Sequence, residues 1–201
     1  MKLLLFSDLH INKKLAKELV QKANEVDIVI GAGDFAIVHR GLEEMITILK
    51  DIEKPTFVVP GNGETTDELM AASQDWKSCQ VLHGNGKNHS GVDFYGIGGG
   101  IPVTPFGAWS YDFTEKEAEE LLHECPSNSI LISHSPPYQI LDKSSSGQHL
   151  GSTTIRKFID QKTPKLLVCG HIHESAGKQE WVNNTLVVNA GPKGIIVNLD
   201  T

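Results

Sequence analysis

The chain of 201 residues contains 39% hydrophobic and 21% charged residues, an ordinary composition for a globular protein long enough to bury a full core. Its 25 acidic and 18 basic residues give a net charge of −7, which argues against a general nucleic-acid surface and against an anionic membrane as partner. A phosphate substrate is compatible with this charge, because bound metal ions reverse its sign within one cleft. We expect residues 1–201 to form a single domain, since no repeat, linker or low-complexity segment interrupts them.

Cysteine usage and apolar runs indicate the compartment. Cys79, Cys125 and Cys169 have neither metal-knuckle nor redox spacing, which is typical of free thiols in a reducing environment. The apolar run at residues 3–6 is too short for a signal-peptide core, and no run approaches the roughly 20 residues that span a bilayer. We therefore expect a soluble, cytoplasmic protein without a membrane partner. The oligomeric state is not predictable from these features.

The first third of the chain alternates between short apolar runs and segments with helical spacing. These expected strands and helices fall, in alternation, at residues 2–6, 12–26, 27–30, 42–49, 56–59 and 65–73. The alternation predicts a parallel sheet with right-handed crossovers, in which ligands bind at the carboxyl ends of the strands. Asp8, Asp34 and Asn62 fall at the ends of the first three strands. Packing does not explain polar residues repeated at one edge of a sheet.

The rest of the chain is expected to add both kinds of element. Strands are predicted at 80–82, 92–97, 129–132 and 165–169, helices at 115–124 and 152–161, and antiparallel strands at 178–182, 186–189 and 194–199. Residues 83–91 are expected to form a loop, and the Ser-rich residues 138–150 a mobile surface loop. The three glycines at 98–100 superficially resemble a phosphate-binding loop, but Pro102 and Pro105 stand where its helix would have to begin.

Five short polar motifs follow expected strands, and each offers metal-ligand side chains. In chain order they are Asp8-x-His10, Gly33-Asp34, Gly61-Asn62, His134 and Gly170-His171-x-His173. Asp, Asn and His donors suit Mn, Fe, Zn, Co or Ni, and the sequence does not select among these ions. Alternate residues of an extended segment point the same way. Each of the pairs Asp8/His10 and His171/His173 is therefore predicted to supply two ligands to the same metal ion.

Asp34 is the candidate for a carboxylate that bridges two ions. Two ions about 3.5–4 Å apart clamp a phosphoryl group for in-line displacement and acidify a bridging water to hydroxide. The five motifs, in this order and over residues 3–190, resemble those of the calcineurin-like metallophosphoesterase family. The resemblance implies an α/β fold, a four-layer α-β-β-α sandwich with mixed sheets, and a cofactor of two divalent metal ions. The ligand sets that it implies are Asp8, His10, Asp34 and His173 for one ion, and Asp34, Asn62, His134 and His171 for the other.

The third motif departs from the family's pattern. It usually reads Gly-Asn-His-Asp or Gly-Asn-His-Glu, whereas here Gly63 replaces the histidine that commonly protonates the leaving group, and Glu64 has nothing at position 63 to orient. General acid catalysis typically contributes about 10²–10⁴-fold, so expulsion of a poor alkoxide is expected to be slow. His39 and His149 are candidates for a substitute acid. Alternatively, Gly63 makes room for a larger substrate.

Two further groups of residues have both a functional and a structural interpretation. Arg40 follows the Asp34 motif and is a candidate contact for a phosphate, but its position is more typical of a solvated residue at a helix start. The aromatic residues Phe106, Trp109 and Tyr111 lie between Gly- and Pro-rich turns. They either line a substrate pocket or pack under a loop.

Together these features predict a dinuclear metal-dependent phosphoesterase. We expect it to hydrolyse small or nucleotide-like phosphodiesters by in-line attack of a metal-bridging hydroxide, with Asp34, Asn62 and His134 as catalytic residues and Asn62 facing the phosphate. Its acidic net charge disfavours a nuclease for long duplexes. The alternatives are a phosphomonoesterase or protein phosphatase, which the glycine at position 63 disfavours, and a non-catalytic protein-binding scaffold, which the seven retained ligands disfavour.

Overall fold

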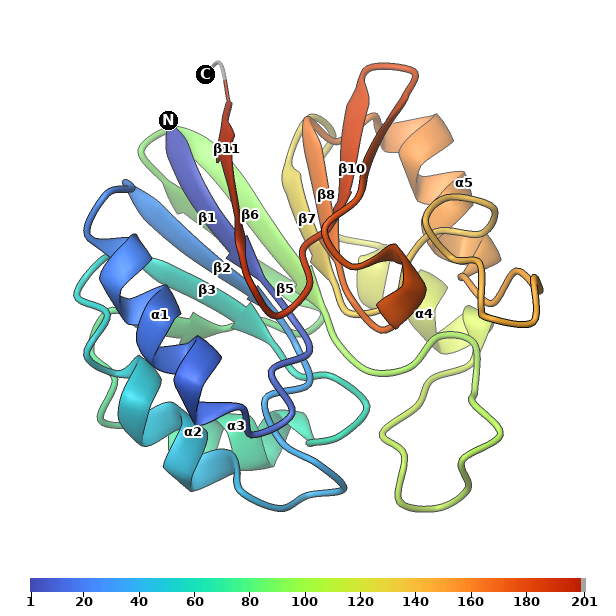
Figure 1. Ribbon diagram of the computed structural model, residues 1–201. Helices are drawn as coiled ribbons and strands as arrows, with labels where there is room; N and C mark the ends of the chain where they lie inside the picture. Colours follow the sequence, from blue (N-terminus) through green and yellow to red (C-terminus); the bar gives the residue numbers. More distant parts are fainter. Residues whose placement is uncertain (200–201) are drawn as a thin grey trace.

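Two mixed β-sheets face each other in the computed structural model, which describes residues 1–199 (Figure 1). The five-stranded sheet has the spatial order β11 (Ile195–Asn198), β1 (Lys2–Phe6), β2 (Ile28–Ala32), β3 (Thr56–Val59) and β4 (Cys79–Val81). The six-stranded sheet has the order β5 (Asn85–His89), β6 (Val92–Ile97), β7 (Ile130–Ser133), β8 (Leu166–Cys169), β10 (Thr185–Asn189) and β9 (Gln179–Val182).

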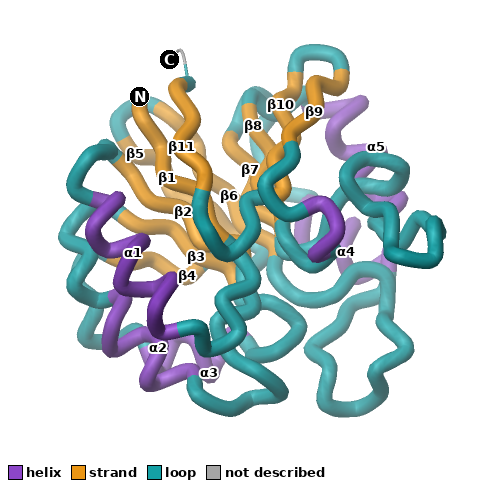
Figure 2. The backbone as a smooth tube through the Cα atoms, in the orientation of Figure 1, coloured by secondary structure: helices purple, strands orange, loops and turns teal. Residues whose placement is uncertain are grey.

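Helices cover the outer face of each sheet, so the chain forms four layers (Figure 2). The first sheet packs against α1 (Lys13–Ala23), α2 (Leu42–Leu49) and α3 (Thr66–Ala72), and the second against α4 (Glu115–Leu122) and α5 (Thr153–Lys162). The predicted four-layer α/β sandwich with mixed sheets is therefore confirmed. Within residues 1–199, none of the helices has the length and apolar character that crossing a membrane requires.

All the α-helices described except α2 begin where the sequence supplies a capping side chain. Asn12, Thr65, Thr114 and Ser152 each accept a hydrogen bond from the backbone N–H three residues further on. Such caps satisfy backbone donors that have no partner within the helix. The expected helix at 12–26 ends at Ala23, three residues early, because Asn24 caps it and Val26 turns into the core before β2.

One expectation for the sheets is wrong, and the partner of the last strand, which is antiparallel as expected, is not one that the sequence predicts. Residues 83–91 contain strand β5, whose polar and mostly exposed residues pair antiparallel with β6 at the edge of the second sheet. Backbone hydrogen bonds form this strand without an apolar face, so no alternating pattern announces it. The last strand, β11, pairs antiparallel with β1 in the first sheet rather than with its neighbour β10, which pairs parallel with β8. Local alternation predicts a strand but does not identify its partner.

The space between the two sheets is filled by apolar side chains from both. Phe57 of β3 and Phe94 of β6 stack across it, with ring centroids 4.3 Å apart and ring planes 14° apart. Both rings are buried. Stacked aromatic pairs contribute beyond the area that they bury, so this pair helps fix how one sheet lies on the other.

We predict that Phe57→Ala lowers the free energy of unfolding by about 3–5 kcal/mol, because it leaves a cavity between the sheets and removes the stack with Phe94. Urea denaturation measures the change. Trp181→Ala is the matched control, since that ring is 66% exposed on β9, and its effect should stay within about 0.5 kcal/mol. Equal losses for the two variants would contradict the assigned role of the stack.

Candidate metal centre

The polar motifs lie in tight loops directly after the strands, in an uncommon backbone conformation. Asp8, His10, Asp34 and His171 have positive φ angles of 54°, 42°, 57° and 65°. The prediction that the pairs Asp8/His10 and His171/His173 lie on extended segments is therefore wrong, because the strands end before these residues. Asp8 and His10 nevertheless reach one group of donor atoms, as predicted, whereas His171 and His173 do not. Left-handed backbone at residues other than glycine is strained, and it clusters at functional sites.

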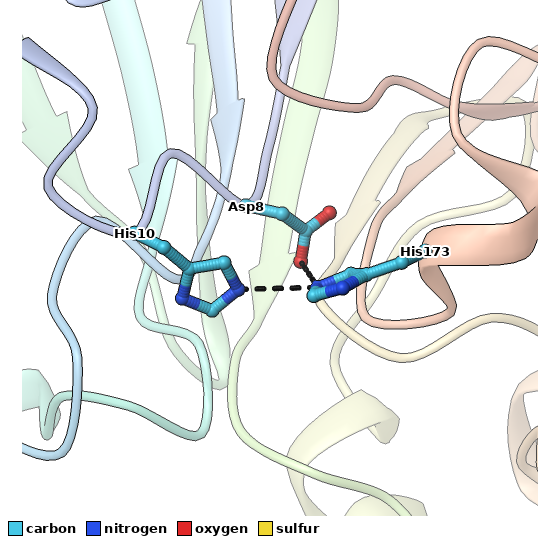
Figure 3. Close-up of side chains that lie close together, drawn as sticks. All are labelled: Asp8, His10 and His173. Atoms are coloured by element: carbon cyan, nitrogen blue, oxygen red, sulfur yellow. Dashed lines mark hydrogen bonds and ion pairs between the residues drawn. The ribbon is translucent and has the colours of Figure 1, made fainter.

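The first group of donor atoms comes from the loop after β1 and from the short 3₁₀ helix η1 (His173–Ser175) (Figure 3). His173 Nε2 lies 3.1 Å from His10 Nε2 and 3.8 Å from Asp8 Oδ1. His10 donates its Nδ1 proton to the carbonyl oxygen of Ala36, at 3.2 Å. Since a carbonyl only accepts, this bond leaves the Nε2 lone pair of a neutral His10 facing the group.

The second group combines the loops after β3, β7 and β8. Asn62 Oδ1 lies 3.2 Å from His134 Nε2 and 3.1 Å from His171 Nδ1, and the two imidazole nitrogens are 3.2 Å apart. His134 donates its Nδ1 proton to the carbonyl of Ala32 at 2.8 Å. Its Nε2 is therefore oriented toward the group in the same way as that of His10.

Asp34 joins the two groups through a single oxygen. Its Oδ2 lies 3.5 Å from His10 Nε2 and 3.6 Å from His134 Nε2. The other oxygen, Oδ1, accepts the backbone N–H of Gly63 at 2.8 Å and is turned away from both. The structure thus brings all seven predicted ligands together, and His171 and His173 face different groups.

The donor set fits divalent metal ions. Ligand atoms about 2.0–2.1 Å from one ion in a tetrahedral site lie about 3.3 Å from one another. The distances given above, between neighbouring donor atoms within each group and from Asp34 Oδ2 to each group, range from 3.1 to 3.8 Å. The Nε2 lone pairs of His10 and His134 face these donor atoms, an arrangement that a cation stabilises.

The charges of the site suit cation binding as well. Burial by itself would raise the pKa of Asp34, but the nearby imidazoles of His134 and His10 lower it by more. The net effect is a lowered pKa, which keeps the carboxylate ionised. Burial, with the neighbouring His134, lowers the pKa of His171 to about 3 and keeps it neutral. Burial also lowers the pKa of His134, yet Asp34 and Asp8 raise it overall. The carboxylates around His134 therefore favour positive charge at this place, which a bound cation would supply.

Glu64 has a role that the sequence did not reveal. Its buried carboxylate accepts the backbone N–H groups of Asp34, Ala36 and Gly61 at 2.9, 2.9 and 2.8 Å. It therefore ties the loop after β2 to the loop after β3, a role that does not depend on the residue at position 63. Burial and the Asp34 charge raise the pKa of Glu64 to about 7. The loops touch so closely that a Cβ atom at Gly61 would clash with Asp34 Oδ1.

Ser110 and Asp112 orient the amide of Asn62. Asn62 donates its Nδ2 to Ser110 Oγ at 3.0 Å, and Ser110 donates its hydroxyl to Asp112 Oδ1 at 2.7 Å. An amide held in this way presents Oδ1 to the histidines. No signal in the sequence distinguishes these two residues, because they lie in an irregular loop far along the chain from Asn62.

Of the four residues proposed from the sequence to contact substrate, only Gly63 lines the cleft beside the donor groups. His39 donates Nε2 to the carbonyl of Trp109 at 2.6 Å and Nδ1 to Glu68 Oε2 at 2.8 Å, and these bonds raise its pKa. His149 Nδ1 pairs with Asp142 Oδ1 at 2.6 Å. Arg40 is exposed and lies outside the cleft. The structure does not bring His39, Arg40 or His149 to the donor groups.

A two-sheet α/β sandwich that gathers Asp, Asn and His donors at its strand ends is the architecture of a metal-dependent hydrolase. A family model described as calcineurin-like phosphoesterase matches residues 1–175. The chain belongs to this family and is a metal-dependent phosphoesterase, which confirms the resemblance seen in the sequence.

Solved structures show the same fold at low identity. The protein TT1561 of Thermus thermophilus is 19% identical, with 96% of this chain and 90% of that chain covered and a TM-score of 0.78. A dimetal phosphatase from Danio rerio is 11% identical, with 94% and 86% covered and a TM-score of 0.60. The purple acid phosphatase PPD1 from yellow lupin is 15% identical, with 100% and 46% covered and a TM-score of 0.57. A comparison with curated proteins finds no match.

We predict that Glu64→Gln lowers the free energy of unfolding at pH 8 by about 1.5–3 kcal/mol. The NH₂ group of the new amide would face a backbone N–H, which is also a donor, and the hydrogen bonds that remain would no longer be made to a charged acceptor. Urea denaturation measures the loss. Glu180→Gln, at an exposed position of β9, is the control and should match the wild type. Identical stability of the two variants would show that the carboxylate does not hold the loops.

Proposed function

We propose that this phosphoesterase binds two divalent metal ions and hydrolyses phosphodiesters with small or nucleotide-like ester groups. The observation that carries the proposal is the position of Asp34 Oδ2, within 3.5 and 3.6 Å of the imidazole nitrogens of His10 and His134. One ion would be held by Asp8, His10, Asp34 and His173. The other would be held by Asp34, Asn62, His134 and His171.

Ions bound in this way polarise phosphoryl oxygens and lower the pKa of a coordinated water. The chain's own residues prepare the site for that chemistry. The carbonyls of Ala32 and Ala36 keep His134 and His10 in the tautomers that ligate. Asn62 lines the cleft, and Ser110 fixes its amide, so we assign Asn62 as the contact for the phosphate.

Charge supports a diester rather than a monoester. Among the described residues that line the cleft, none is Lys or Arg. A monoester carries about 1.5–2 negative charges at neutral pH, and the second charge would find no cationic side chain there. A diester carries one negative charge, which the metal site alone can balance.

The first test is metal content together with substrate preference. We expect chelator-treated protein to bind two Mn²⁺ per chain by calorimetry, and to hydrolyse bis(p-nitrophenyl) phosphate with a higher kcat/KM than p-nitrophenyl phosphate. Asp34→Asn should lose both properties, because it weakens the ligand shared by the two sites, while the exposed Asp75→Asn should keep them. A single ion per chain would contradict the dinuclear site, and a preference for the monoester would contradict the diester.

The second test concerns the glycine at position 63. Among the described residues that line the cleft, Glu174 is the only ionisable one that is not a proposed ligand, and it is exposed. Gly63→His should therefore raise turnover of unactivated alkyl diesters, by up to about 10²–10⁴-fold, and leave activated aryl diesters unchanged. A Cβ atom at this position would lie 3.2 Å from Ala36 O and 3.2 Å from Asp34 Oδ1, so a small shift of these neighbouring atoms would accommodate it.

Gly63→Ala is the control for that shift, because it adds the Cβ without an acid. If Gly63→His changes alkyl and aryl diesters by the same factor, or no more than Gly63→Ala does, the glycine does not mark a missing acid.

A further inference from the structure

Exposed apolar side chains are concentrated beside the candidate metal centre. A cleft of about 360 Å³ opens there, and the donor groups form one end of it. Eleven large apolar side chains are exposed within residues 1–199, and five of them line this cleft, namely Ile37, Val38, Phe106, Trp109 and Leu150. Apolar surface that is gathered in one place and exposed to water is typical of a binding site.

Two of these residues form a flat aromatic face. The rings of Phe106 and Trp109 are stacked, with centroids 5.5 Å apart and planes 16° apart. They nevertheless remain 51% and 36% exposed, so they do not pack under the loop as the structural interpretation of the sequence required. Tyr111, the third aromatic residue of this segment, points elsewhere and contacts Thr66.

The loop that carries the two rings is anchored to the metal centre. Its backbone N–H at Tyr111 donates to the carbonyl of Asn62 at 3.0 Å, and its Ser110 accepts the Asn62 amide. On the other side, His39 donates to the carbonyl of Trp109. The aromatic face is therefore held at a fixed place relative to a proposed ligand, which lowers the entropy lost when a substrate binds.

The charge of the cleft limits what this face can bind. The described residues of its lining include no Lys or Arg, and Glu174 is a carboxylate that is not a proposed ligand. A second phosphate, or the backbone of a polynucleotide, would meet apolar side chains and this carboxylate. The lining thus favours an uncharged ester group next to a single phosphate.

We propose that the stacked face of Phe106 and Trp109 is the subsite for a flat aromatic ester group, a nucleobase or an aryl ring, of a substrate with one phosphate. This inference rests on the proposed function, since it places the phosphate on the metal centre. A ring stacked on an aromatic side chain improves binding by roughly 5- to 100-fold. Ile37, Val38 and Leu150 supply the remaining apolar lining.

The test compares phosphinates, which are monoanions like a diester and have no ester bond to hydrolyse. Calorimetry on the Mn²⁺-loaded protein should show methyl(phenyl)phosphinate binding at least about 5-fold more tightly than dimethylphosphinate, since a phenyl ring replaces one methyl group. Trp109→Ala and Phe106→Ala should bring this ratio close to one while Mn²⁺ content and dimethylphosphinate affinity stay unchanged. Trp109→Phe, which keeps a ring, should retain most of the ratio.

Trp181→Ala removes an exposed tryptophan that does not line the cleft and should leave the ratio intact. A phosphinate that carries a nucleoside in place of the phenyl group distinguishes the two sources of the ring: tighter binding than methyl(phenyl)phosphinate assigns a nucleobase, and weaker binding assigns a simple aryl group. A ratio near one in the wild type, or one that Trp109→Ala leaves unchanged, overturns the subsite even where two ions and diester hydrolysis are found. If no phosphinate binds and no diester is hydrolysed, both proposals fail.

Discussion

The contact between the loops after β2 and β3 is the constraint on which the candidate metal centre depends. The Asp34 carboxylate has to sit between two groups of donors, and a left-handed backbone turn aims it there. Glu64 stabilises that turn by accepting N–H groups from both loops, and Gly61 allows them to approach within a distance that a Cβ would forbid. Burying a carboxylate is unfavourable unless several donors satisfy it, and the loops supply those donors.

The rest of the fold brings the remaining ligands to this contact. Parallel pairing of β1, β2 and β3, and of β6, β7 and β8, sends the carboxyl ends of each set of strands to one edge. Because the sheets face each other, the two edges meet, and ligands from the second sheet close around Asp34. Strand β11 crosses back beside β1, and the backbone carbonyl of Gly191, just before it, accepts the N–H of Ser7 next to Asp8.

Much of this arrangement could be predicted from the sequence, because it depends on strand ends. Asp8, Asp34 and Asn62 follow apolar runs in a strand–helix alternation, and parallel sheets necessarily collect such residues. The prediction failed where the cause is not local. An edge strand held by backbone pairing has no apolar pattern, and the partner of β11 is chosen by packing. Ser110 approaches Asn62 only because an irregular loop folds back over the cleft, and residue spacing carries no record of that path.

Under the proposed function, two independent features of the cleft point to the same kind of substrate. Gly63 stands in place of a histidine, and within residues 1–199 the cleft lining offers no acid besides Glu174 and the proposed ligands. Departure of the leaving group then depends on its own stability as an anion. An aryl oxide is a far more stable anion than an alkoxide, because its ring delocalises the charge. The stacked rings of Phe106 and Trp109 favour a flat aromatic group for a different reason, the match between apolar faces. If the aromatic group is also the leaving group, the subsite that binds it compensates for the missing acid, and the histidine becomes unnecessary for that substrate.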